Sequence, residues 1–216
     1  MVLVCGIDEA GRGPLIGPMV MSGILIDEKD LDKLRDLKVR DSKLIAPKQR
    51  EFLFKEIKKI IIKEKTIVVP AQEIDDALNS EDLNLNKLEA IKTAMIINYL
   101  KPDRATVDCP SVNVKAYTEY LKTFIKSETK LKVEHKADYK YIESSSASIL
   151  AKVTRDREIE KLKKKHNVDF GSGYPSDPKT KEFLKNNYKK YDFFRKTWST
   201  YKKVADIKKQ KNLRDY

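Results

Sequence analysis

The order of its apolar segments restricts the fold of this chain more than any other feature. Residues 1–8 and 18–26 form two short apolar runs rich in β-branched side chains, and a loop rich in Gly and Pro separates them. This spacing predicts a β-hairpin. Strand-like runs and helical patterns alternate through the rest of the chain. A hairpin followed by such alternation is typical of an α/β fold in which helices flank a mixed sheet.

The later segments fit this alternation. Further strands are expected at residues 66–70, 104–109 and 131–135. Helices are expected from Pro47 onward, between a cap at Ser80 and a stop at Pro102, at 114–125 and at 144–165. A loop rich in Gly and Pro at 169–178 then precedes short C-terminal helices. We therefore expect one principal domain with a helical extension at its C-terminal end.

The net charge of +12 is concentrated near the C-terminus. Between Arg155 and Tyr216 there are 19 basic and nine acidic side chains, so this third of the chain carries most of the excess. Such a distribution favours a polyanionic partner that contacts the C-terminal part. Solubility, or the Lys- and Glu-rich composition of a thermophilic protein, would explain the same charge without a nucleic acid.

The apolar segments and the cysteines exclude several other classes of protein. No run approaches the roughly 18 apolar residues of a membrane span, and the N-terminal segment lacks the basic region of a signal peptide. We therefore expect a cytoplasmic protein without a membrane partner. Cys5 and Cys109 lie in apolar runs without CxxC spacing, which favours two buried thiols over a disulfide or a zinc site.

Four acids occupy the edges of apolar elements. Asp8 and Glu9 follow the first run, Asp108 follows the strand near residue 107, and Asp138 precedes the long helix. If these carboxylates converge, repulsion and desolvation require a cation, and oxygen ligands favour Mg²⁺ or Mn²⁺. Two such ions about 3.5–4 Å apart serve phosphodiester hydrolysis. On spacing alone, the alternative that Asp108 and Asp138 are only turn or cap residues stays open.

The segment Gly6-Ile7-Asp8-Glu9-Ala10-Gly11-Arg12-Gly13-Pro14 resembles the N-terminal signature of ribonuclease HII. The resemblance continues, in the order of the family, at residues 41–43, 107–110, 136–138, 144–152, 155–156 and 171–177. The last of these motifs is similar to the archaeal version. Six ordered matches across most of the chain are difficult to obtain by chance.

This resemblance implies an RNase H-like catalytic domain over residues 1–178 and a basic helical extension over 179–216 packed on it. It implies that Asp8, Glu9, Asp108 and Asp138 bind two divalent ions, Mg²⁺ or Mn²⁺. The implied activity is hydrolysis of the RNA strand of RNA–DNA hybrids and cutting on the 5′ side of ribonucleotides in duplex DNA. A metal-activated water would attack, leaving 3′-hydroxyl and 5′-phosphate ends without a covalent enzyme intermediate.

The Gly11-Arg12-Gly13 motif suits recognition of a ribose. Flanking glycines let the backbone approach a sugar closely, and an arginine can clamp a phosphate. A tight turn between two strands is the alternative for these residues. Tyr174 lies in a Gly-Tyr-Pro loop; its ring and hydroxyl could contact a sugar and its 2′-OH, which distinguishes RNA from DNA. The resemblance implies that this tyrosine reads the RNA–DNA junction, and a packed surface tyrosine is the alternative.

Other polar residues in the matched motifs are candidate phosphate contacts. They are Lys43, Ser144, Ser146, Lys152 and Arg155. Each could equally be a solvated charge or a helix cap.

The C-terminal residues 210–216 resemble a sliding-clamp-binding peptide. Gln210, Leu213 and Tyr216 stand at the usual offsets, although a second terminal aromatic residue is missing. A frayed terminus without a partner is the alternative. We expect the chain to be a monomer.

Three other functions compete with this interpretation. A superfamily nuclease or integrase acting on plain DNA or RNA would have no use for the glycine motif together with Tyr174. Ribonuclease HIII usually carries an additional N-terminal domain, whereas here the catalytic motif begins at once. A basic module without catalytic activity would explain the charge, but acids at a phosphate-binding surface would weaken its binding.

Overall fold

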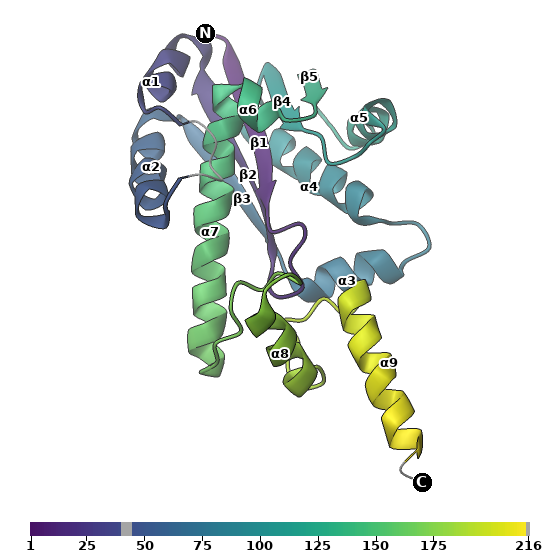
Figure 1. Cartoon of the computed structure of the whole chain (residues 1–216). Helices are drawn as coiled ribbons and strands as arrows, with labels where there is room; N and C mark the ends of the chain where they lie inside the picture. The colour runs from purple at the N-terminus through teal and green to yellow at the C-terminus, as the bar shows by residue number, and fades with distance from the viewer. Residues whose placement is uncertain (40–44, 215–216) are drawn as a thin grey trace.

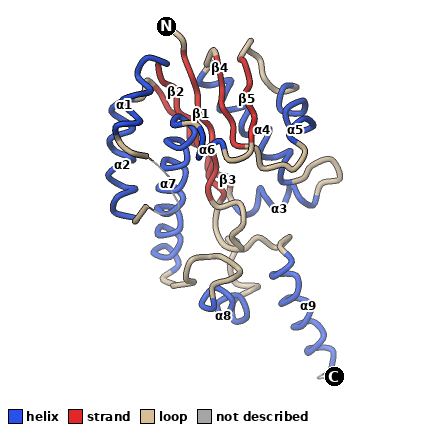
Figure 2. The backbone as a smooth tube through the Cα atoms, turned by 45° about the horizontal axis from the view of Figure 1, so that its top comes forward, coloured by secondary structure: helices blue, strands red, loops and turns tan. Residues whose placement is uncertain are grey.

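A computed structural model describes residues 1–39 and 45–214 of the chain, with side chains as far as Ile207. Its centre is a five-stranded sheet in the order β3-β2-β1-β4-β5 (Figures 1 and 2). The strands are β1 (Leu3–Ala10), β2 (Met19–Asp27), β3 (Lys63–Val69), β4 (Arg104–Asp108) and β5 (Lys130–Glu134). β1 pairs antiparallel with β2, and parallel pairing joins β1 to β4 and β4 to β5. The predicted hairpin and mixed sheet are confirmed.

Helices cover both faces of this sheet. One face carries α1 (Leu31–Asp36), α2 (Pro47–Ile60) and α7 (Ile142–His166), and the other carries α3 (Ala71–Asn79), α4 (Leu85–Leu100) and α5 (Val114–Lys122). The alternation of β1 explains this arrangement, because successive side chains of a strand point to opposite faces. Val4 packs with the α7 side, whereas Cys5 and Ile7 pack with the α4 side. Both cysteines are free and buried, as predicted.

Two features of the fold differ from the sequence-based expectation. The helix predicted after Ser80 is preceded by another, α3, and α4 begins only at Leu85, where the Asn84 side chain accepts a hydrogen bond from the Lys87 N–H. β1 also extends beyond its predicted end, because its pairing with β2 continues to Ala10 opposite Val20. Asp8 and Glu9, which were expected to follow the first strand, therefore lie inside it.

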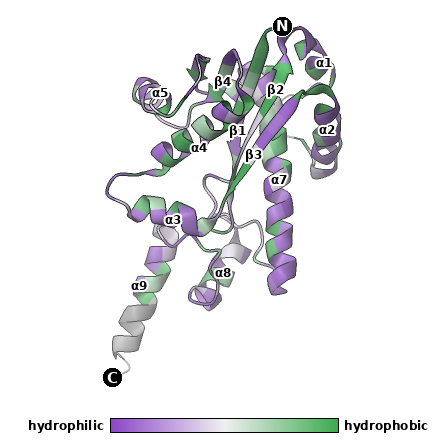
Figure 3. Cartoon of the chain, turned by 180° about the vertical axis from the view of Figure 1, so that it is seen from behind, coloured by the Kyte–Doolittle hydropathy of each residue, from purple (hydrophilic) through white to green (hydrophobic). Residues whose placement is uncertain are grey.

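The C-terminal segment adds α8 (Pro178–Asn187) and α9 (Ser199–Arg214). An aromatic cluster that includes Phe170, Phe193, Phe194 and Tyr201 joins this segment to Leu15 and other residues of the body. α9 then runs away from the body (Figure 1). The part of α7 beyond the sheet is mostly hydrophilic (Figure 3). None of the helices in the described ranges is long and apolar enough to cross a membrane.

Candidate active site

The parallel pairing of β1 and β4 places two acids side by side at one edge of the sheet. Ile7 lies opposite Val107, so the next residues, Asp8 and Asp108, are neighbours on the same face. Glu9 follows at once in β1. Carboxylate oxygens of Asp8, Glu9 and Asp108 all lie within 4.8 Å of one another. The structure thus brings together three of the four acids selected from the sequence.

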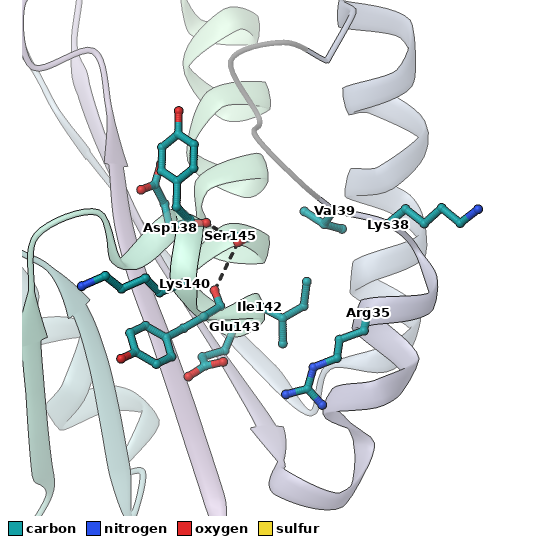
Figure 4. A pocket seen from close by; sticks show the side chains of 10 residues that line it. Arg35, Lys38, Val39, Asp138, Lys140, Ile142, Glu143 and Ser145 are labelled. Atoms are coloured by element: carbon teal, nitrogen blue, oxygen red, sulfur yellow. Dashed lines mark hydrogen bonds between the residues drawn. The ribbon is translucent and has the colours of Figure 1, made fainter.

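The fourth acid, Asp138, lies at the flank of this group. It belongs to α6 (Ala137–Lys140; Figure 4), a short helix that the sequence analysis did not predict. The Ala137 N–H donates a hydrogen bond of 2.7 Å to Asp108 Oδ1, so the next residue, Asp138, stands beside the cluster. Asp138 is also close enough to Asp8 to raise the pKa of that carboxyl group. We call these four acids, the cluster of three and Asp138 beside it, the acid row.

The electrostatics of the cluster call for a cation. Burial, with a smaller contribution from Asp108 and Asp138, raises the pKa of Asp8 to about 7, although a hydrogen bond from Ser148 lowers it. Burial and the neighbouring carboxylates also hold the pKa of Glu9 well above its usual value. Buried carboxylates without compensating positive charge are unstable when ionised. Because all the donors are hard oxygens, the site fits Mg²⁺ or Mn²⁺.

Helix α7 lies directly against the backbone of β1 at Gly6. A Cβ atom at Gly6 would lie 2.1 Å from the Glu143 carbonyl carbon, so only glycine permits this approach. The contact lets the Ser144 hydroxyl donate to the Ile7 carbonyl at 3.1 Å and brings Ser148 to Asp8. The spacing between helix and strand therefore sets the position of Asp8.

The same contact overturns two of the predicted phosphate contacts. Ser144 and Ser146 are both fully buried. Ser144 is occupied with β1, and the Ser146 hydroxyl lacks a hydrogen-bond partner within the described part of the chain. A phosphate cannot reach either hydroxyl, so their prediction as nucleic-acid contacts is wrong.

Two side chains that the sequence analysis did not select donate hydrogen bonds to the backbone of the Gly11–Gly13 turn. Arg195 is fully buried and donates hydrogen bonds to the carbonyls of Gly11, Arg12 and Gly17 at 2.5, 2.8 and 3.1 Å. The Trp198 indole N–H donates to the Gly13 carbonyl at 3.1 Å. The shape of the turn is thus fixed by the chain itself.

The Arg12 side chain is fixed by helix α4. Its guanidinium donates to Glu89 at 2.9 Å and to Asn86 at 2.7 Å. Burial raises the pKa of Glu89 to about 7, while the guanidinium of Arg12 acts in the opposite direction. Glu89 also lies near enough to Glu9 to raise the pKa of that acid. The turn and the acid row are therefore electrostatically connected.

A cavity of about 370 Å³ lies between the turn and α7, and we call it the turn cavity. It is lined by Glu9, Gly11, Arg12, Gly13, Lys152, Arg155 and Tyr174, among others. Arg155 is mostly buried, and its Nε and Nη2 have no hydrogen-bond partner among the described residues. Its guanidinium lies 5.5 Å from the centre of the Tyr174 ring. Since Gly11 has φ 81° and a Cβ there would lie 2.2 Å from Arg155 Nε, glycine is required at this position.

Some selected residues cannot be placed in the site. Lys43 lies outside the described residues, as does Tyr216. Gln210 and Leu213 fall within α9, in the part whose side chains are not described.

The family model for ribonuclease HII matches residues 5–201. The chain belongs to the ribonuclease HII family. Ribonuclease HII of Pyrococcus horikoshii is 47% identical over 209 residues, which are 94% of this chain and 93% of that one. Ribonuclease HII of Methanothermobacter thermautotrophicus is 42% identical over 93% of this chain and 98% of its own. Membership makes the chain an endoribonuclease that hydrolyses RNA paired with DNA and depends on divalent metal ions.

Solved structures of the family agree with the fold. The crystal structure of ribonuclease H2 from Pyrococcus horikoshii has a TM-score of 0.86 at 45% identity, over 95% of this chain and 98% of that chain. Ribonuclease HII from Archaeoglobus fulgidus, solved in complex with PCNA, has a TM-score of 0.83 at 40% identity, over 91% and 94%. A ribonuclease HIII at 19% identity, with a TM-score of 0.82, shares the fold. The RNase H-like fold expected from the sequence is confirmed.

Proposed function

We propose that this ribonuclease HII cuts on the 5′ side of a ribonucleotide embedded in duplex DNA, in addition to hydrolysing the RNA of hybrids. The observation that carries this proposal is the composition of the turn cavity. Glu9 lines it together with the Gly11–Gly13 turn and Tyr174. A ribose seated against this turn would place the adjoining phosphate at the acids. Since the 2′-hydroxyl separates RNA from DNA, recognition and cutting would be coupled at one ribonucleotide.

The four acids Asp8, Glu9, Asp108 and Asp138 would hold two divalent ions, Mg²⁺ or Mn²⁺. When bound, such ions activate a water as nucleophile and stabilise the leaving oxygen of an in-line displacement. Side chains and backbone groups already orient the acids: Ser148 bonds Asp8, and the Ala137 N–H bonds Asp108. The products would carry 3′-hydroxyl and 5′-phosphate ends.

The cations and the tyrosine of the turn cavity would bind the substrate. Lys152 and Arg155 supply positive charge beside Glu9, and charge-assisted contacts to phosphate are strong. Tyr174, with an exposed fraction of 42%, presents its ring and hydroxyl at the mouth of the cavity. Arg12, held by Glu89, would contribute a fixed guanidinium to the same strand.

The test uses labelled duplex DNA that contains one ribonucleotide, with an all-DNA duplex of the same sequence as the control. We expect cleavage on the 5′ side of the ribonucleotide with Mg²⁺ or Mn²⁺, none in EDTA, and none of the control. Asp8→Asn should bind the duplex without cutting it. Cleavage of the all-DNA duplex would favour a general nuclease, and wild-type binding without metal-dependent cleavage would favour a module without catalytic activity.

We further propose that the C-terminal residues bind a sliding clamp. The supporting observations are the clamp-like spacing of Gln210, Leu213 and Tyr216 and the solved PCNA complex of the Archaeoglobus fulgidus relative. α9, which contains Gln210 and Leu213, runs away from the catalytic body (Figure 1), so a clamp bound to this helix would not cover the acids. We expect calorimetry to show binding of the full chain to an archaeal clamp, and loss of binding when residues 210–216 are removed. Equal binding by both chains would exclude this segment as the contact.

A further inference from the structure

The two side chains that bond the Gly11–Gly13 turn lie close together in the sequence. Arg195 and Trp198 belong to residues 195–198, a loop that precedes α9 and that we call the support segment. The Arg195 guanidinium lies 4.9 Å from the centre of the Trp198 ring. The turn therefore keeps its hydrogen-bond donors only while this short loop stays in place.

Asp75 of α3 fixes the support segment through its backbone. The Lys196 N–H donates to one carboxylate oxygen at 2.7 Å, and the N–H and hydroxyl of Thr197 donate to the other at 2.9 and 2.5 Å. Asp75 is buried, with an exposed fraction of 4%. Three donors to one buried carboxylate constrain the loop strongly, because their release would leave a buried charge without hydrogen bonds.

Asp75 also compensates the buried charge of Arg195. Burial and the nearby charge of Arg155 lower the pKa of the Arg195 guanidinium to about 9, whereas Asp75 acts in the opposite direction. A buried cation is costly unless a negative charge lies nearby. Asp75 thus stabilises both the position of the support segment and the ionised form in which Arg195 donates to the turn.

Helix α3 is itself anchored in the core, so Asp75 is a firm attachment point. Ile74 and Ala77 of this helix are buried in the core cluster that also contains residues of β1 and α4. α3 lies beside the start of α9 in Figure 1. A continuous series of contacts therefore runs from the core through Asp75 and the support segment to the turn.

We propose that Asp75 is a positioning residue for cleavage: by holding the support segment, it sets the shape of the turn that receives the ribose. It acts through Arg195 and Trp198 and not on the substrate itself. This role rests on the proposed function in one respect, namely that a ribose is seated against the turn. Every ribonucleotide of an RNA–DNA hybrid presents such a ribose, so the effect extends to hybrids.

A double-mutant cycle on an RNA–DNA hybrid tests this role. Asp75→Ala should lower kcat/KM about tenfold, because three donors lose their acceptor and the supports of the turn move. Combined with Arg195→Met, it should cut at most about twofold slower than Arg195→Met alone, whereas independent losses would multiply. Each variant is assayed well below its own thermal midpoint, so that unfolding does not contribute.

Trp198 provides a readout that does not depend on activity. It is the only tryptophan of the sequence, and its indole N–H donates to the Gly13 carbonyl at 3.1 Å. In Asp75→Ala its fluorescence emission should shift to longer wavelengths, because the indole loses this contact and is exposed to water. Asp76→Ala removes the exposed neighbouring carboxylate of the same helix. This control should keep both the emission and the kcat/KM of the wild type.

Two variants of Thr197 make a milder change and serve as the test if Asp75→Ala does not fold. Thr197→Val removes one of the three donors while keeping the size of the side chain, and it should lower kcat/KM about threefold. Thr197→Ser keeps the hydroxyl and should retain the wild-type value.

Several results would overturn the proposal. Wild-type cleavage by Asp75→Ala, or equal cleavage by Thr197→Val and Thr197→Ser, would show that the bonds to Asp75 do not control the turn. Losses that multiply in the cycle, or a loss of activity with unchanged Trp198 emission, would show that Asp75 acts elsewhere. Wild-type cleavage by Arg195→Met is a separate outcome, which would remove the role of the turn in the proposed function and this proposal with it.

Discussion

The acid row and the Gly11–Gly13 turn are adjacent parts of one site, yet they differ in how their polar groups are satisfied. The carboxylate of Asp8 is buried and that of Glu9 is half-buried beside other acids, and the pKa values of both are raised. The turn instead has its carbonyls bonded by Arg195 and Trp198. The acid row therefore needs an ion from solution to compensate its charge, whereas the chain itself supplies the hydrogen-bond donors of the turn.

This difference predicts that substitutions in the two parts have different consequences. Removing an acid relieves repulsion in the metal-free chain, so it should abolish catalysis without loss of stability. Removing a support of the turn leaves buried polar groups without partners, so it should reduce stability and catalysis together.

The largest effect is expected for Asp8→Asn. Cleavage should fall at least about a hundredfold, since a metal ligand contributes several kcal/mol to such a reaction. The thermal midpoint of the metal-free variant at pH 8 should rise above that of the wild type, because a destabilising buried charge is removed. A calorimetric scan in EDTA measures this midpoint, and a lower value for the variant would contradict the comparison.

The pH dependence of the same variant sharpens this prediction. A raised pKa means that folded Asp8 keeps its proton up to about pH 7, whereas the unfolded chain loses it near pH 4. The stability of the metal-free wild type should therefore fall as the pH rises from about 4 to 7 and then level off. In Asp8→Asn this slope should be smaller. The free energy of unfolding is measured by urea unfolding at pH 5, 6, 7 and 8. If it changed equally with pH in the wild type and in Asp8→Asn, the result would argue against a buried Asp8 charge.

Arg195→Met is expected to have the next largest effect. Three carbonyls lose their donor, and each buried group without a partner costs about 1–3 kcal/mol. We expect a loss of about 3 kcal/mol in the free energy of unfolding and at least tenfold in kcat/KM for single-ribonucleotide duplexes. Urea unfolding and kinetics measure both. Lys196→Met, at an exposed neighbouring position, is the matched control and should resemble the wild type.

Metal addition should have a moderate effect that is confined to the acid row. An ion at a hundred times its Kd stabilises the folded chain by about 2.7 kcal/mol. Mn²⁺ should therefore raise the thermal midpoint of the wild type and of Arg195→Met, but not that of Asp8→Asn. A midpoint that rises equally in Asp8→Asn would place the ion elsewhere.

The smallest effect is expected for Glu89→Gln. The amide can still accept a hydrogen bond from Arg12, but the ion pair is lost, and the Arg12 side chain is 39% exposed, which weakens such a pair. We expect a decrease of about threefold in kcat/KM, measured on the single-ribonucleotide duplex, with an unchanged thermal midpoint. A loss as large as that of Arg195→Met would show that the side chain of Arg12 matters more than the shape of the turn.

Most of the fold could be predicted because burial of one face leaves a regular pattern in the sequence. The hairpin and the start of α2 at Pro47 are examples. The break between α3 and α4 could not be predicted in the same way. Leu78, Leu83 and Leu85 all pack on the same core cluster, so the apolar pattern continues through the segment where the helix is interrupted.

The acids could be predicted because they flank apolar runs of the sequence, but their supports could not. Arg195 bonds residues more than 170 positions earlier, and no local pattern encodes such a contact. A weak signal was present, since Arg195 directly follows Phe193 and Phe194. The predicted phosphate contacts at Ser144 and Ser146 were wrong for a different reason. Residues 143–151 of α7 are all buried, so this part of the helix has no face exposed to a substrate.

Gly6 shows how a missing methyl group can control the chemistry. Because the α7 backbone is in direct contact with this residue, the absence of a side chain at Gly6 sets the distance between helix and strand. An alanine there would push α7 away from β1, so that Ser148 would move away from Asp8 and the Asp8 carboxylate would lose its position beside the other acids. The alignment of the acids thus depends on a residue two positions earlier in the same strand, whose side chain is a single hydrogen.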